Sequence, residues 1–124
     1  MARKIKLDFY NKQFVIEYAN RSEVKEYFAN LKQYKKNIDK IINDKNISEK
    51  ETIETGYGAL RILIKAGLVE HHANEMPSDS DIDRWISSMP NAKQFFEKLI
   101  SMIQEVMSEI GEDRKNIKWE VEDN

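Results

Sequence analysis

Repeated start and stop signals for helices divide the last two thirds of the sequence. Ser48-Glu-Lys-Glu51 and Ser78-Asp-Ser-Asp81 each place a serine three residues before an acid, the pattern of a capping box that opens a helix. Apolar residues at helical spacing follow both motifs. Gly67 is a natural helix C-cap and Pro90 interrupts helical continuation. The pattern predicts helices over residues 48–67, 78–89 and 91–110, with Gly111 closing the last.

The first third of the sequence has a different period. Ile5, Leu7 and Phe9 alternate with polar residues, and the alternation resumes over Gln13–Tyr18. Asn11 lies between the two runs and tolerates a positive φ, as a tight turn requires. Two short alternating runs around such a turn predict a β-hairpin.

A long amphipathic helix is predicted next, capped by Asn20 or Ser22 and ending before Asp44. Its apolar residues follow a 3-4-3-4 spacing: Val24, Tyr27, Leu31, Tyr34, Ile38 and Ile41. The spacing suits either a coiled coil or a helix packed in a bundle. The bundle is favoured because the repeat covers only three heptads and places tyrosines at two inward positions.

The fold expected from these elements is α+β and mostly α, with the N-terminal hairpin followed by a four-helix, bundle-like domain. The 124 residues match one domain, which we place at residues 1–111, followed by an acidic tail at 112–124. Ile117, Trp119 and Val121 alternate with polar residues in this tail. It either adds a short third strand to the hairpin or becomes ordered only on a partner.

Two glycines, Gly56 and Gly58, lie inside the second predicted helix, where each costs about 1 kcal/mol relative to alanine. They indicate either close approach of another element or a hinge. Close packing is the preferred interpretation.

The segment between Gly67 and Arg84 holds both histidines and five acids, and it resembles a ligand cluster. Asp79-Ser-Asp81-Ile-Asp83 matches the start of a calcium loop, but the sixth and twelfth positions are Arg84 and Pro90 instead of glycine and glutamate. The adjacent His71 and His72 diverge on a helix or strand, so zinc would need both plus Glu75 or Asp79 in a loop.

Ser78 and Ser80 lack the strained turn or orienting group of a nucleophile. Glycine-rich phosphate loops and other catalytic motifs are also missing from the sequence. We therefore expect no catalytic, metal or cofactor site, and interpret the segment as a helix stop, a loop and a helix start.

Charge and composition limit the classes of partner that this chain would bind. The sequence has no cysteine and no apolar run of about 20 residues that would span a bilayer. Residues 1–66 carry 14 basic and 9 acidic side chains, whereas residues 67–124 carry 6 and 13. This polarity suits association between proteins. The lysines at 32, 35, 36 and 40 form a modest basic strip, which we interpret as a solvated helix face. We expect a cytoplasmic protein that binds neither membrane nor nucleic acid; homo-oligomer formation stays open.

The last predicted helix is apolar at ten of its twenty positions, more than one face requires. Such a helix either sits centrally in the bundle or keeps part of its surface for a partner. The candidate partner-binding residues are Phe95, Met102, Ile103 and Met107. Methionine adapts to varied partners, but a role in the core fits the same four residues equally well.

The order of these parts resembles a known family. The hairpin at Ile5–Tyr18, the long helix, the segment Tyr57-Gly-Ala-Leu-Arg-Ile-Leu-Ile-Lys-Ala-Gly-Leu68 and the following Pro-Ser-Asp-Ser-Asp-Ile-Asp-Arg-Trp85 resemble the tail assembly chaperones of long-tailed bacteriophages and Gram-positive prophages. The resemblance covers roughly residues 4–110 and consists of helix caps and core positions.

The resemblance implies a non-enzymatic function. Chaperones of this family bind the long helical tape measure protein and recruit tail tube subunits in the host cytoplasm during tail morphogenesis. The resemblance assigns no binding residue to a position in this sequence. Two alternatives stay open: a small helical adaptor or inhibitor that binds one defined protein, and a nucleic-acid-binding regulator using the lysine strip.

Overall fold

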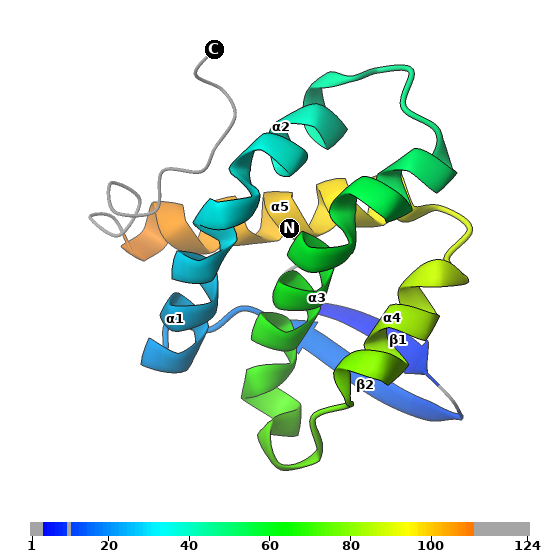
Figure 1. The fold of residues 1–124 in the computed structure, drawn as a ribbon. Coiled ribbons are helices and arrows are strands. Elements are labelled where there is room, and N and C mark those ends of the chain that lie inside the picture. The colour runs from blue at the N-terminus through cyan, green and yellow to red at the C-terminus, as the bar shows by residue number, and fades with distance from the viewer. Residues whose placement is uncertain (1–3, 10, 111–124) are drawn as a thin grey trace.

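A computed structural model describes residues 4–9 and 11–110 (Figure 1). An N-terminal antiparallel hairpin is followed by helices, which confirms the expected mostly helical α+β fold. The predicted acidic tail, its third strand and the closing Gly111 lie outside the described residues. The elements are β1 (Lys4–Phe9), β2 (Lys12–Glu17), α1 (Ser22–Asn30), η1 (Leu31–Tyr34), α2 (Lys35–Asn43), α3 (Glu49–His72), η2 (Ala73–Glu75), α4 (Asp79–Ser87) and α5 (Ala92–Ile110), where η marks a 3₁₀ turn.

The hairpin forms where the alternating pattern predicted it. Leu7 pairs with Phe14 and Phe9 with Lys12, so residues 10 and 11 connect the strands. Asn11 has a φ of 62°, the left-handed conformation that asparagine tolerates better than most residues. The inward face of the hairpin carries Phe14 and Ile16, both buried.

The long helix predicted from Asn20 or Ser22 to before Asp44 forms over residues 22–43, but it is not one continuous α-helix. The 3₁₀ turn η1 interrupts it and separates α1 from α2. Arg21 occupies the N-cap of α1 without a side-chain cap, so neither Asn20 nor Ser22 has the predicted role. Both α1 and α2 contact α3, on either side of this turn. Tyr34, at the end of η1, then lies against α3.

Glycines let α3 make these contacts closely. A Cβ atom on Gly58 would lie 2.4 Å from the ring of Tyr34, and one on Gly56 would lie 3.0 Å from Cδ1 of Ile41. Both glycines lie inside the continuous helix α3. The packing interpretation of the two glycines is thereby confirmed.

The predicted end of α3 at Gly67 is also wrong. The helix continues to His72, and Gly67 is buried within it. A Cβ atom on Gly67 would lie 2.4 Å from Cγ2 of Ile16, so the missing side chain provides space for β2 to cross the helix. The Tyr18 hydroxyl donates to the Leu63 carbonyl at 2.7 Å, one turn earlier on the same face. A contact between distant segments therefore explains this glycine.

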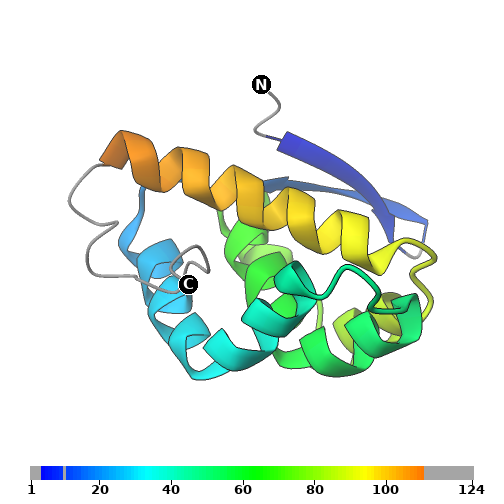
Figure 2. The same ribbon diagram turned by 90° about the horizontal axis from the view of Figure 1, so that it is seen from above.

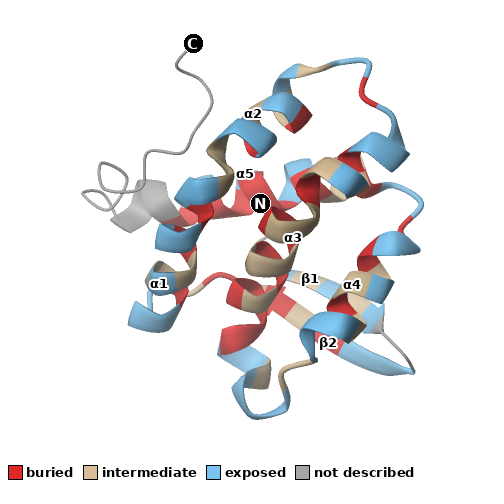
Figure 3. Ribbon diagram, viewed as in Figure 1, coloured by how far each residue is buried: buried red, intermediate tan, exposed pale blue. Residues whose placement is uncertain are grey.

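The core surrounds α3, which contacts β2 and all four other α-helices. Buried residues line the inner faces of the helices (Figure 3), and α5 runs crosswise to α3 (Figure 2). Ser48 forms the predicted full capping box with Glu51 at the start of α3. Within the described part of the chain, no helix is long and apolar enough to cross a membrane.

Candidate functional site

The two histidines of the suspected ligand cluster bind the hairpin. The Nε2 atom of His72 accepts the backbone N–H of Val15 at 2.9 Å. Its ring lies edge-on to that of Phe14, with centroids 4.8 Å apart. The Nε2 atom of His71 lies 2.7 Å from the carboxylate of Glu17. Both imidazoles thus fix the end of α3 against β2.

The aspartates of the same cluster join α4 to α3. Asp83 forms a two-pronged pair with Arg61, with N–O distances of 3.0 and 2.7 Å. Asp79 pairs with Lys65, one turn further along α3, at 2.6 Å. The hydrogen bond from Lys65 lowers the pKa of Asp79, and the hydrogen bond to Asp83 raises the pKa of Arg61.

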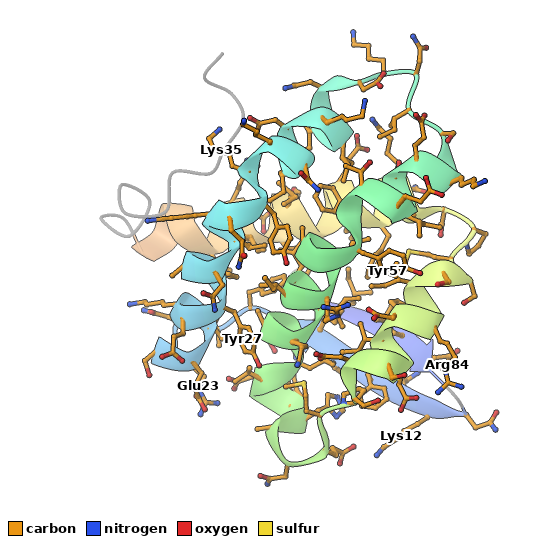
Figure 4. All side chains as sticks on the ribbon, viewed as in Figure 1. Lys12, Glu23, Tyr27, Lys35, Tyr57 and Arg84 are labelled. Carbon is orange, nitrogen blue, oxygen red and sulfur yellow. The ribbon has the colours of Figure 1, made fainter. Side chains whose placement is uncertain are left out.

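Two further contacts complete this connection between α3 and α4. The Tyr57 hydroxyl reaches from α3 towards α4 and contacts the Ser87 hydroxyl (Figure 4). Ser78 accepts the backbone N–H of Asp81 at 3.1 Å, which confirms the predicted N-cap of α4. Among the residues described, no three His, Asp or Glu side chains are grouped so that they would hold a metal ion.

The four candidate partner-binding residues occupy different environments. Met102 and Ile103 are buried in the core, so the intact domain does not present them to a partner. Phe95 is only partly buried and packs against the core from outside. The side chain of Met107 lies outside the described part of the molecule. The structure therefore does not bring the four together as one exposed surface.

Phe95 lines a groove between β1 and the corner where α4 meets α5. The cavity has a volume of about 500 Å³. The Phe95 ring meets that of Trp85 edge to face, with centroids 5.5 Å apart and planes at 83°. The lining residues are Lys4, Ile5, Leu7, Trp85, Ser88, Met89, Pro90, Asn91, Gln94, Phe95 and Lys98.

The lining divides into an apolar floor and a polar rim. Two aromatic rings form the floor together with Ile5, Leu7 and Met89. The cations at the rim are Lys4 and Lys98, both exposed. A cavity with an aromatic floor and a few polar groups is typical of a site that anchors a large apolar side chain.

The two edges of the hairpin differ. The outer edge of β2 lies against the end of α3, where His72 accepts from Val15, and against η2, where Glu75 pairs with Lys12 at 2.6 Å. In the sheet as described, β1 pairs only with β2, so its other edge is open beside the groove.

The orientation of the Val15 N–H shows which residue pairs of the hairpin share backbone hydrogen bonds. Its N–H points away from β1, so the pair formed by Lys6 and Val15 lacks mutual hydrogen bonds. Alternation along an antiparallel ladder then directs the backbone N–H and C=O groups of Lys4, Lys6 and Asp8 towards the open edge.

Sequence reasoning identified Phe95 but missed the rest of this site. Trp85, one of the apolar residues at helical spacing after Ser78, is only partly buried and lies at the groove. Ile5 and Leu7 served only to predict the hairpin. No local signal places β1 beside the corner of α4 and α5, because the residues concerned are about 80 positions apart. No known protein-family model, curated protein or solved structure matches this chain.

Proposed function

We propose that this protein is a tail assembly chaperone that binds a tape measure protein and recruits tail tube subunits during phage or prophage tail morphogenesis. The observation that carries the proposal is the groove with partly buried Trp85 and Phe95 on its floor. The resemblance in the order of the hairpin and the capped helices supports the specific family. The proposed action is binding, without catalysis or a cofactor.

The groove suits an amphipathic partner segment. Its aromatic floor accepts one or two large apolar side chains, whereas Lys4 and Lys98 at the rim favour acids beside those anchors. Tape measure proteins are long helices that would supply such segments repeatedly. Several chaperone molecules would then cover one tape measure protein and keep its apolar stripe from aggregating.

Co-expression with the tape measure protein of the same phage or prophage tests the proposal. We expect a soluble complex containing several copies of this chain per partner. Trp85→Ala and Lys98→Glu should each weaken the complex at least about tenfold, as expected for an anchor and a rim charge. Tyr27→Ala is the matched control, because Tyr27 is a partly buried aromatic on α1, away from the groove (Figure 4).

The result must separate binding from folding. Circular dichroism and thermal unfolding should show that each variant keeps its helices, and Lys98→Glu alters an exposed residue outside the core. Absence of any complex with the tape measure protein would refute the proposal. A fixed one-to-one complex with a different, folded protein would instead support the adaptor alternative.

A further inference from the structure

The open edge of β1 leaves the hairpin incomplete. A two-stranded sheet is marginally stable by itself, and three residues of β1 direct backbone groups outward without a strand beside them in the described chain. On the inward face, Ile5 and Leu7 are only partly buried and line the groove. A third strand would satisfy the backbone groups, and its inward side chains would enter the groove.

The sequence after α5 contains a segment with the matching pattern. Residues 117–122 read Ile-Lys-Trp-Glu-Val-Glu, with three apolar residues alternating with charged ones. We propose that residues 117–122 of a second copy of this chain add to β1 as an antiparallel strand. Exchange in both directions would produce a dimer.

Charge complementarity selects the antiparallel orientation. Setting Glu120 opposite Lys6 puts oppositely charged residues together along the exposed face, where β1 carries Lys4, Lys6 and Asp8. The three pairs are Asp8 with Lys118, Lys6 with Glu120, and Lys4 with Glu122. Directly opposite residues share a face of the sheet, so the same register places Trp119 beside Leu7 and Val121 beside Ile5, both towards the groove.

No parallel register both pairs opposite charges on the exposed face and directs only apolar side chains towards the groove. With Glu120 beside Lys6, parallel strands put Lys118 beside Lys4 and Glu122 beside Asp8, two repulsive pairs. Moving the segment by two residues in one direction leaves like charges together at Lys6 and Asp8. Moving it by two in the other direction places Asp123 beside Leu7, facing the apolar groove.

The reach of the chain assigns the strand to a second copy. Figure 2 shows β1 starting beside the middle of α5 and running towards the first residues of α5. To run antiparallel to β1, the same chain would have to return along the whole of α5, whose 19 residues span about 28 Å. The eight residue spacings from Ile110 to Lys118 extend to at most about 27 Å, which leaves no length for the sideways displacement from α5 to the open edge of β1. A second copy has no such restriction.

Cross-linking tests the pairing directly, because the sequence contains no cysteine. A Lys6→Cys chain is mixed with a Glu120→Cys chain and treated with a short bis-maleimide. We expect a covalent dimer of one chain of each kind. The control mixture replaces Lys6→Cys with Lys50→Cys, which is exposed at the start of α3. A dimer yield no higher than in the control, or a cross-link within one chain carrying both cysteines, would overturn the proposal.

Sedimentation equilibrium of the full chain gives an independent test. Trp119→Ala should weaken dimerisation at least about tenfold. Lys6→Glu and Glu120→Lys should each weaken it about fivefold, and the chain carrying both should recover to within about twofold of the original affinity. A monomeric full chain at all concentrations, or charge variants without mutual rescue, would contradict the exchanged strand.

One consequence rests on the proposed function, whereas the dimer itself does not. If the tape measure protein binds the same groove, the exchanged strand competes with it. Trp119→Ala should then increase capture of the tape measure protein while lowering dimer content. Loss of the dimer in Trp119→Ala without increased capture would refute only the competition. A wild-type chain that dimerises but captures no tape measure protein would refute only the proposed function.

Discussion

The Nε2 atom of His72 accepts the backbone N–H of Val15 at 2.9 Å, which joins the last residue of α3 to the outer edge of β2. This bond fixes the histidine tautomer, because a nitrogen that accepts here carries no proton and leaves the proton on Nδ1. The bond also satisfies a strand N–H that β1 does not reach. The end of α3 therefore supplies one hydrogen-bond acceptor that a neighbouring strand would otherwise provide.

Replacing His72 tests this relationship. We expect His72→Phe to keep the ring packing on Phe14 but to leave the Val15 N–H without its acceptor, at a cost of about 1–2 kcal/mol in the free energy of unfolding. Urea denaturation measures the loss, and hydrogen exchange at the Val15 amide should accelerate. His71→Phe is the matched control, since its exposed pair with Glu17 should contribute less than about 1 kcal/mol.

Gly67→Ala should destabilise the protein, although alanine normally favours a helix by about 1 kcal/mol over glycine. The new Cβ would lie 2.4 Å from Cγ2 of Ile16, an atom bonded directly to Cβ that can withdraw only if the buried side chain changes its χ1 rotamer or the strand shifts. We expect a net loss of about 2–3 kcal/mol, measured by thermal or urea unfolding. In a double-mutant cycle, Ile16→Ala should remove most of the penalty; additive effects would contradict direct contact.

Lys93 connects α5 to the end of α2 through two carbonyl groups. Its Nζ atom donates to Ile41 at 2.7 Å and to Asp44 at 2.9 Å. A cation is favourable at a helix C-terminus. Lys93→Met preserves the aliphatic stem and should lower the free energy of unfolding by about 1–2 kcal/mol. Lys36→Met, at an exposed position on α2, should change it by less than about 0.5 kcal/mol.

The connection between α3 and α4 should weaken in acid. Lys65 lowers the pKa of Asp79 in the folded protein, so the pair stabilises the fold above the ordinary aspartate pKa. That contribution is lost as the pH falls through the lowered pKa, below about pH 4. Because Asp79 is largely exposed, screening limits the effect to about 0.5 kcal/mol.

Asp79→Asn measures this contribution. Between pH 7 and pH 3 the free energy of unfolding should change less in the variant than in the original chain. The two changes should differ by about 0.5 kcal/mol. Ser80→Asn, a neighbouring exposed change without a carboxylate, is the control. An identical pH dependence in Asp79→Asn and the original chain would show that the pair contributes nothing.

Local features were predicted well wherever the responsible residues were neighbours in sequence. The capping box from Ser48 to Glu51 uses groups three positions apart, and Asn11 adopts its positive φ within a two-residue turn. Alternation was sufficient to predict the hairpin, because a strand directs successive side chains to opposite faces.

Errors occurred where a distant segment determined the outcome. Glycine is typical of a helix end, but at Gly67 strand β2 crosses the helix and the helix continues. The break at residues 31–34 lies within an unbroken heptad pattern, and its last residue, Tyr34, packs against Gly58. Two of the four candidate partner-binding residues, Met102 and Ile103, are core residues, a role that the sequence left equally open. The apolar stripe of α5 does not reveal which of its parts other elements cover.

The sequence by itself therefore determined the hairpin, most helix boundaries and the unsuitability of the histidine and aspartate segment for calcium, since these depend on short-range hydrogen bonding, periodicity and spacing. Only the tertiary structure decided what that segment does. His72 and Asp83 bind partners 57 and 22 positions away, and the groove exists because β1 packs beside the corner of α4 and α5. Contacts over such separations depend on how the helices pack, and no local pattern encodes that packing.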